Sequence, residues 1–216
     1  MRAVVFPVSR SFEDVSAERA AARIILPVSS LTILLLAMHG LLGWPSLSLF
    51  ADSRGPWFSW SHLVLAVAYF AIHLTNRRYG PDYAFAQIVV SLGLCGGVLF
   101  VWPELAQVVL RTAAPPSVRE VMAFVVAFLA SGFLSIIAFD CTRGPHWWMA
   151  PLTGSLVAGA SFVLLFYPAA YAGSDVFWGE HMRIHAGVLV LAAVAGLLPY
   201  QLLRSSIQPL PGFGGY

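Results

Sequence analysis

The chain has 216 residues, of which 59% are hydrophobic and 10% carry a formal charge. Its mean hydropathy of +0.79 is far above that of a soluble domain, and its net charge of +2 is too small and too dispersed for a nucleic-acid-binding protein. The composition therefore predicts a membrane protein and excludes nucleic acid as a partner.

Six apolar stretches, each about 20 residues long, follow one another along the chain and are separated by short loops that carry Arg. A helix of that length crosses a hydrocarbon core of roughly 30 Å, and it satisfies its own backbone hydrogen bonds where no water is present. The sequence therefore predicts an all-α, polytopic integral membrane protein with six transmembrane helices in one compact bundle. The predicted spans are Ile24–Leu42, Trp57–Leu74, Ala84–Trp102, Val121–Asp140, Met149–Tyr171 and Ile184–Leu203.

The segments outside the spans are short, so the sequence predicts one membrane domain over residues 24–204. Residues 1–23 are expected to form a cytoplasmic segment with a short amphipathic helix over residues 11–23, where Arg19 and Arg23 meet lipid headgroups. Residues 205–216 are rich in Pro and Gly and are expected to form an extended cytoplasmic tail.

The distribution of Arg predicts the orientation, because basic residues gather on the cytoplasmic side of a membrane protein. With six spans, eight Arg lie on the side of the two termini and four lie on the opposite side. We therefore expect both termini in the cytoplasm. The larger group is Arg2, Arg10, Arg19, Arg23, Arg77, Arg78, Arg143 and Arg204, and the smaller is Arg54, Arg111, Arg119 and Arg183.

Few polar side chains lie within the predicted spans, and the ionisable ones are mostly His39, His62, His73 and His185. An ionisable group at membrane depth normally faces the bundle interior and marks a pathway or a ligand, whereas a neutral His can also be a packing residue. No Gly-rich phosphate loop, intramembrane carboxylate pair or metal-binding His motif is present. The sequence therefore predicts no enzyme activity, metal or cofactor. A haem held by two of these His is the alternative.

Three segments resemble the vitamin uptake transporter family, whose best-known members import queuosine precursors. The second predicted span ends in HLTNRRYG (His73–Gly80), the fourth is followed by WWMAPLTGSL (Trp147–Leu156), and the sixth closes with LLPY (Leu197–Tyr200). Chain length, span number and loop lengths agree with the family along nearly the whole chain. The resemblance implies a small six-helix protein of the bacterial inner membrane that takes up 7-deazaguanine bases.

The chain departs from this family at the acidic residues within the membrane. The family's Asp residues in the second, fourth and sixth spans fall on His73, Ser135 and His185, and its Asn and Asp in the fifth fall on Gly159 and Phe162. Buried carboxylates are natural acceptors for the N–H groups of a deazaguanine. The resemblance therefore implies an altered or lost substrate specificity, and we expect queuosine precursors to be imported poorly.

Two functions are compatible with these observations. In the first, the chain is a small-solute transporter whose site lies at the membrane midplane, with His73 and His185 close together inside the bundle. The expected substrate-binding residues are His73, Ser135, Gly159, Ser161 and His185. In the second, the chain is a non-transporting accessory subunit of a larger membrane complex, and Phe162 fills its centre. The expected partners are membrane lipids together with a small-molecule solute or other membrane subunits.

Overall fold

A computed structural model describes residues 12–41, 51–52, 55–56, 60–101, 104, 117–175 and 178–209. The predicted N-terminal segment and C-terminal tail are therefore described only in part, since residues 1–11 and 210–216 lie outside these ranges.

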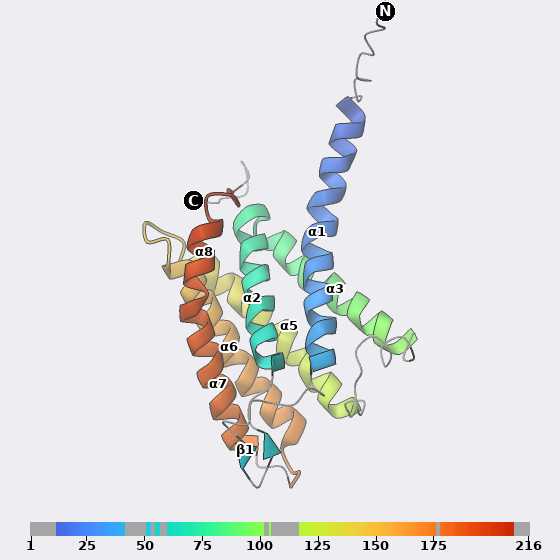
Figure 1. Cartoon of the computed structure of the whole chain (residues 1–216), viewed down its shortest axis with the longest axis vertical. Helices are drawn as coiled ribbons and strands as arrows, with labels where there is room; N and C mark the ends of the chain where they lie inside the picture. The colour runs from blue at the N-terminus through green and yellow to red at the C-terminus, as the bar shows by residue number, and fades with distance from the viewer. Residues whose placement is uncertain are drawn as a thin grey trace, which may run out of the picture.

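The described chain is helical apart from one short hairpin between the first two helices (Figure 1). Its strands β1 (Ala51–Asp52) and β2 (Gly55–Pro56) pair antiparallel. Successive long helices run in opposite directions, so the start of α1 and the end of α8 lie at one end of the bundle, here called the α8 end (Figure 1). The opposite end, here called the hairpin end, holds the starts of α2, α5 and α7. The helices are α1 (Phe12–Leu41), α2 (Trp60–Tyr79), α3 (Pro81–Val101), α5 (Val118–Cys141), α6 (Met149–Tyr171), α7 (Trp178–Ala195) and α8 (Leu197–Leu203).

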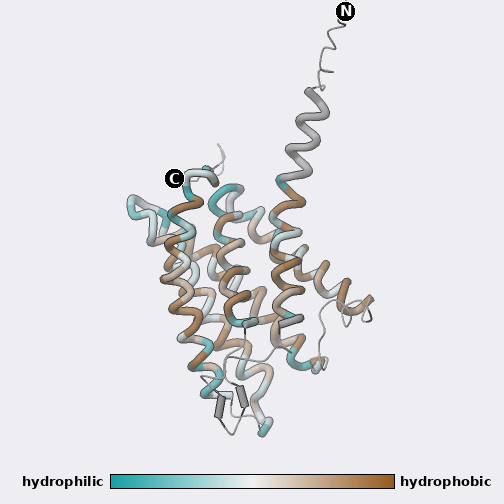
Figure 2. The backbone as a smooth tube through the Cα atoms, in the orientation of Figure 1, coloured by the Kyte–Doolittle hydropathy of each residue, from teal (hydrophilic) through white to brown (hydrophobic). Residues whose placement is uncertain are grey.

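Four helical segments are long and apolar enough to cross a membrane. They are α3, α5, α6 and the combined α7–α8 segment Trp178–Leu203. The apolar part of α1, Arg23–His39, is shorter, and α2 is less apolar than these four. Hydrophobic residues fill the middle of the bundle, while hydrophilic residues gather at its two ends (Figure 2). This distribution is the one expected of a helical membrane protein.

Helix α2 is the centre of the bundle, because it packs against α1, α3, α5, α6 and α7. Its polar side chains lie on the inside: Tyr69, His73 and Asn76 are all buried. The Tyr69 hydroxyl group is 2.5 Å from the hydroxyl group of Ser131 on α5. Polar groups that face the interior explain why α2 is less apolar than its neighbours.

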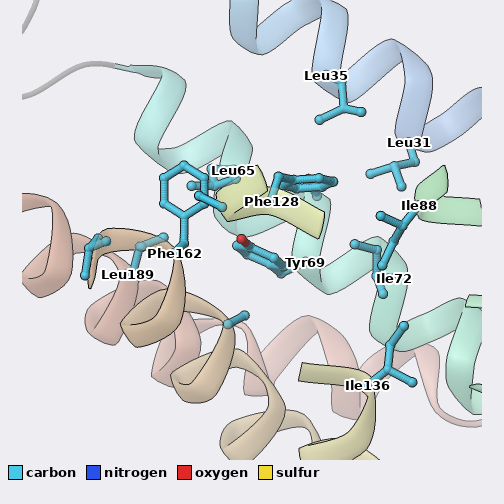
Figure 3. Close-up of a cluster of buried hydrophobic side chains, with 14 of the residues drawn as sticks. Leu31, Leu35, Leu65, Tyr69, Ile72, Ile88, Phe128, Ile136, Phe162 and Leu189 are labelled. Atoms are coloured by element: carbon cyan, nitrogen blue, oxygen red, sulfur yellow. The ribbon is translucent and has the colours of Figure 1, made fainter. Parts of the chain in front are cut away.

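The hydrophobic core forms around α2 and draws on every long helix (Figure 3). Aromatic rings lie at its centre, where Tyr69 stacks on Phe128 with ring centroids 5.5 Å apart. The labelled core residues are Leu31, Leu35, Leu65, Tyr69, Ile72, Ile88, Phe128, Ile136, Phe162 and Leu189.

Helix α1 differs from the expectation of a separate amphipathic helix over residues 11–23. It is one helix from Phe12 to Leu41, and its first part extends beyond the rest of the bundle (Figure 1). The sequence SAERAAAR, residues 16–23, consists largely of strong helix formers and has no helix breaker. The helix therefore continues through the expected boundary at residue 23.

The sixth predicted span is divided into two helices. Helix α7 ends at Ala195, and α8 begins at Leu197. The cause is Pro199, which lacks the backbone N–H that would bond to the carbonyl of Ala195. The Tyr200 N–H still bonds to the Gly196 carbonyl at 3.1 Å, so α8 continues in the direction of α7.

Candidate functional site

A cavity of about 240 Å3 lies toward the hairpin end and is lined by residues of all six long helices. Its wall is mainly aromatic and aliphatic, with a few polar groups. Phe100 belongs to the wall and is 75% exposed, so the cavity reaches the surface of the described chain. Its polar and aromatic lining residues include His39, Ser61, His62, Glu120, Phe124, Phe162, Phe166, Tyr167, Tyr171 and His185.

Two imidazole rings form one side of this cavity. His62, in the first turn of α2, stacks on His185 of α7 with ring centroids 3.9 Å apart and an interplanar angle of 20°. Nδ1 of His185 lies 3.2 Å from the hydroxyl group of Tyr167 on α6. Phe162 meets the His185 ring edge-on at 5.8 Å. These contacts hold the His185 ring in one position from three sides.

The second ring nitrogen of His185 is a buried polar atom with no hydrogen-bond partner among the described residues. This atom is Nε2, and the residue is only 3% exposed. Nε2 is a donor when the Tyr167 hydroxyl group donates to Nδ1, and Nε2 is an acceptor when Nδ1 donates to that hydroxyl group. An unsatisfied buried polar group costs about 1–3 kcal/mol. A polar group brought into the cavity could remove this cost.

Glu120 places a carboxylate in the same wall, at the start of α5. It forms a capping box with Ser117: Oε2 accepts from the Ser117 backbone N–H and hydroxyl group, each at 2.8 Å. Oε1 accepts from the Tyr171 hydroxyl group at 2.8 Å. A carboxylate has about four acceptor positions, and these three bonds leave about one for a donor in the cavity.

The start of α5 is also tied to the end of α6 by Arg119. Its guanidinium group donates to the carbonyl groups of Ala169 at 2.8 Å and Ala172 at 2.7 Å. The carbonyl groups of a C-terminal helical turn have no partners within the helix, and a cation there is favourable. Arg119 therefore helps to fix the position of Glu120 relative to Tyr171.

Of the five predicted substrate-binding residues, only His185 lines this cavity. His73 packs between α2, α5 and α6: its Nδ1 lies 3.4 Å from the Ser155 hydroxyl group, and its ring stacks on Phe139. The Ser135 hydroxyl group donates to the Gly132 carbonyl of its own helix. Ser161 bonds in the same way to Val157, and Gly159 faces Leu189 of α7. Substrate binding by these four residues stays a prediction.

The prediction that His73 and His185 lie close together is wrong. His185 stacks on His62 instead. His62 and His73 are eleven residues apart on α2, which is about 16 Å along a helix. The expectation relied on the acidic positions of the resembled family, and this chain brings different residues together.

Most polar residues of the cavity wall were not among the five predicted substrate-binding residues, and Glu120, Tyr167 and Tyr171 are the ones that bond within the wall. The S-x-x-E pattern at Ser117–Glu120, directly before an apolar run, is a recognisable capping box. It indicates where the helix begins, but it does not show that the carboxylate faces a cavity. Tyr167 and Tyr171 are four residues apart and so share one face of α6, a spacing that is equally common in packed cores.

The described residues contain no group of three or more His, Cys, Asp and Glu that could hold a metal ion. The His62 and His185 rings lie face to face. Two axial haem ligands would instead direct ring nitrogens at an iron between them, so this pair does not have the geometry of a haem site.

The chain matches no protein-family model, no curated protein and no solved structure. Its resemblance to the vitamin uptake transporter family stays a prediction, and a function has to be inferred from the geometry of the cavity.

Proposed function

We propose that the chain is a six-span membrane carrier and that the cavity at the hairpin end binds its solute. The observation that carries this proposal is His185, which lines a cavity of about 240 Å3 and whose buried Nε2 atom has no partner among the described residues. A small-molecule site is a concave, mainly apolar cavity with a few polar groups, and His185 and Glu120 are such groups in this cavity.

The position of α2 supports the six-span arrangement. Helix α2 packs against α3, α5, α6 and α7, which all belong to the four long apolar segments, and also against α1. A helix enclosed in this way crosses the same layer as its neighbours. Its buried polar residues do not meet lipid, so its lower hydropathy is compatible with spanning. The Arg23–His39 segment packs on α2 and α3 and exposes apolar side chains such as Leu26 and Ile33 on its outer side, as a helix that borders lipid does.

The cavity suits a small planar solute. A cavity of about 150 Å3 holds a benzene ring, so about 240 Å3 accommodates one or two fused rings. Phe124, Phe162 and Phe166 offer faces and edges against which such rings can pack. Glu120 can accept from an N–H group of the solute, and His185 Nε2 can form a second hydrogen bond. The chemical class is therefore a nitrogen heterocycle, in keeping with the resemblance to 7-deazaguanine carriers.

The accessory-subunit hypothesis is less well supported. It expects Phe162 to fill the centre of the bundle. Phe162 is indeed buried in the hydrophobic core, but it also lines the cavity beside His185 and Phe166, so its side chain leaves that space open. A cavity with polar groups in its wall has no evident use in a purely structural subunit.

Exchange of labelled guanine into proteoliposomes tests the proposal. Guanine is the probe because it is planar, has two rings and carries both donors and acceptors. The wild-type chain is expected to exchange internal for external guanine. His185→Phe keeps a ring but removes both nitrogens. The loss of one hydrogen bond to a buried group should weaken the apparent affinity of the variant for guanine roughly 5- to 150-fold.

Two further variants separate this site from the alternatives. Thr32→Val is the matched control, because the Thr32 hydroxyl group bonds to the Val28 carbonyl of its own helix and lies outside the cavity wall. It should exchange guanine like the wild type. Ser135→Ala should also do so. Loss of exchange in Ser135→Ala with normal exchange in His185→Phe would contradict the cavity as the binding site and favour a site at Ser135. No exchange by the wild-type chain would overturn the carrier proposal.

A further inference from the structure

A second, cationic pocket lies at the α8 end, away from the solute cavity. Its volume is about 70 Å3, and it lies where α2, the α5–α6 connection and α8 meet (Figure 1). Arg77 comes from the last turn of α2, Arg143 from the α5–α6 connection and Arg204 from the end of α8. The remaining wall is formed by Phe139, Gly144, Pro145, His146, Trp147, Ala150 and Tyr200.

Two of the three guanidinium groups are held in place by neighbouring backbone and rings. Arg143 donates to Asp140 at 2.7 Å and to the Asn76 carbonyl at 3.0 Å, and it lies 5.2 Å from the Phe139 ring centroid. Arg77 donates to the Ile207 carbonyl at 3.1 Å and lies 5.8 Å from the Tyr200 ring centroid. These contacts arrange positive charge around the pocket before any ligand arrives.

Three guanidinium groups converge on the pocket. Among the described residues, Arg77, Arg143 and Arg204 line it together with no Asp or Glu. Asp140 bonds to Arg143 from outside this lining. A guanidinium group binds phosphate through two parallel N–H donors. The pocket volume of about 70 Å3 accommodates about five water-sized groups, which is the size of one phosphate group.

We propose that this pocket binds the phosphate group of an anionic membrane phospholipid. The surroundings favour a lipid over a soluble phosphate. Trp147 lines the pocket, and the adjacent Trp148 is 43% exposed, as is typical of the membrane interface. Leu198 and Leu202 of α8 are 69% and 68% exposed and precede Arg204, so an apolar face for an acyl chain adjoins the cationic pocket. Basic pockets between spanning helices are sites of this kind.

Native mass spectrometry of the full chain in detergent, titrated with dioleoyl phosphatidylglycerol, tests this proposal. Arg204→Gln is the main variant, because Arg204 is exposed and its removal leaves the Arg143–Asp140 pair intact. We expect affinity for phosphatidylglycerol to fall about 5-fold per lost Arg. Arg204→Lys keeps the charge and should retain most of the affinity.

Arg183→Gln is the matched control, since it removes the same charge from an exposed position of α7 near the hairpin end. Two results would support the proposal. Arg183→Gln should bind phosphatidylglycerol as the wild type does, and the wild type should bind phosphatidylcholine more weakly than phosphatidylglycerol. An equal loss in Arg183→Gln and Arg204→Gln would show a general surface charge effect and overturn it. Displacement of the lipid by millimolar inorganic phosphate would also overturn it, by assigning the pocket to a soluble phosphate.

Discussion

Gly154 determines how closely α6 approaches the ring of His73. A Cβ atom at position 154 would lie 2.9 Å from Nε2 of His73 and 3.2 Å from Cβ of Phe139. Nε2 of His73 is buried and has no hydrogen-bond partner among the described residues. The small residue therefore serves close packing of α2, α5 and α6, as small residues do between membrane helices.

We predict that Gly154→Ala destabilises the protein. The added methyl group gains helix propensity of about 0.5–1 kcal/mol, but overpacking a tight interface costs about 1–3 kcal/mol. The Cβ of Phe139 is fixed to its backbone and can move little, so the clash should outweigh the propensity. Thermal unfolding in detergent, followed by circular dichroism, measures the change in Tm.

Gly93→Ala is the control for this variant. Gly93 lies within α3, and a Cβ atom there would meet no described atom within 4 Å. Only the propensity gain applies, so its Tm should be equal to or higher than that of the wild type. A Tm for Gly154→Ala as high as that of Gly93→Ala would show that the His73 ring can move away from the added methyl group.

At the scale of elements, α1 and α3 are joined at the point where Pro27 interrupts the hydrogen bonding of α1. Gln87 Nε2 donates to the Pro27 carbonyl at 2.7 Å, and the Ser91 hydroxyl group donates to the Val28 carbonyl at 3.0 Å. Both donors are buried and lie one turn apart on α3. Neighbouring helices commonly bond to backbone groups near a Pro in a membrane helix.

We predict that removing both donors, as Gln87→Ala with Ser91→Ala, loosens the α1–α3 contact and lowers Tm. Hydrogen bonds between membrane helices contribute about 0.6 kcal/mol on average and up to about 1.7 kcal/mol, so the double variant should lose about 1–3 kcal/mol. Ser30→Ala is the control, because the Ser30 hydroxyl group bonds to the Pro27 carbonyl from within α1. An equal Tm for the double variant and Ser30→Ala would contradict the prediction.

The long helices could be predicted from hydropathy, because an apolar run of about 20 residues has few other stable forms in lipid. The arrangement of the site could not. Hydropathy reports how apolar a helix is, and it does not report which helix faces which: His62 and His185 are far apart in the sequence and stack in the bundle. The polar residues of α2 lower its hydropathy. The helix can carry them because they are buried where it packs against five other helices, which only the fold shows.

At the scale of the whole molecule, the two ends of the bundle differ in charge. Among residues with described side chains, Arg23, Arg77, Arg78, Arg143 and Arg204 lie toward the α8 end, and Arg119 and Arg183 lie toward the hairpin end. Basic residues concentrate on the cytoplasmic side. The α8 end, with its cationic pocket, should therefore face the cytoplasm, and the cavity at the hairpin end should lie toward the outer face.

The last prediction is the topology that follows from this asymmetry: six spans with both termini in the cytoplasm. Alkaline phosphatase is active only outside the cytoplasm, and green fluorescent protein exported in unfolded form fluoresces only inside it. Fusions of each reporter after Asp52, after Gly80 and after Tyr216 should place residue 52 outside and residues 80 and 216 inside. If only α3, α5, α6 and the α7–α8 segment crossed the membrane, all three fusions would report the same side. The fusion after Asp52 therefore distinguishes six spans from four, because it alone lies between α1 and α2. A cytoplasmic result there would contradict the spanning of these two helices, and with it the proposed solute site, because both helices line the cavity.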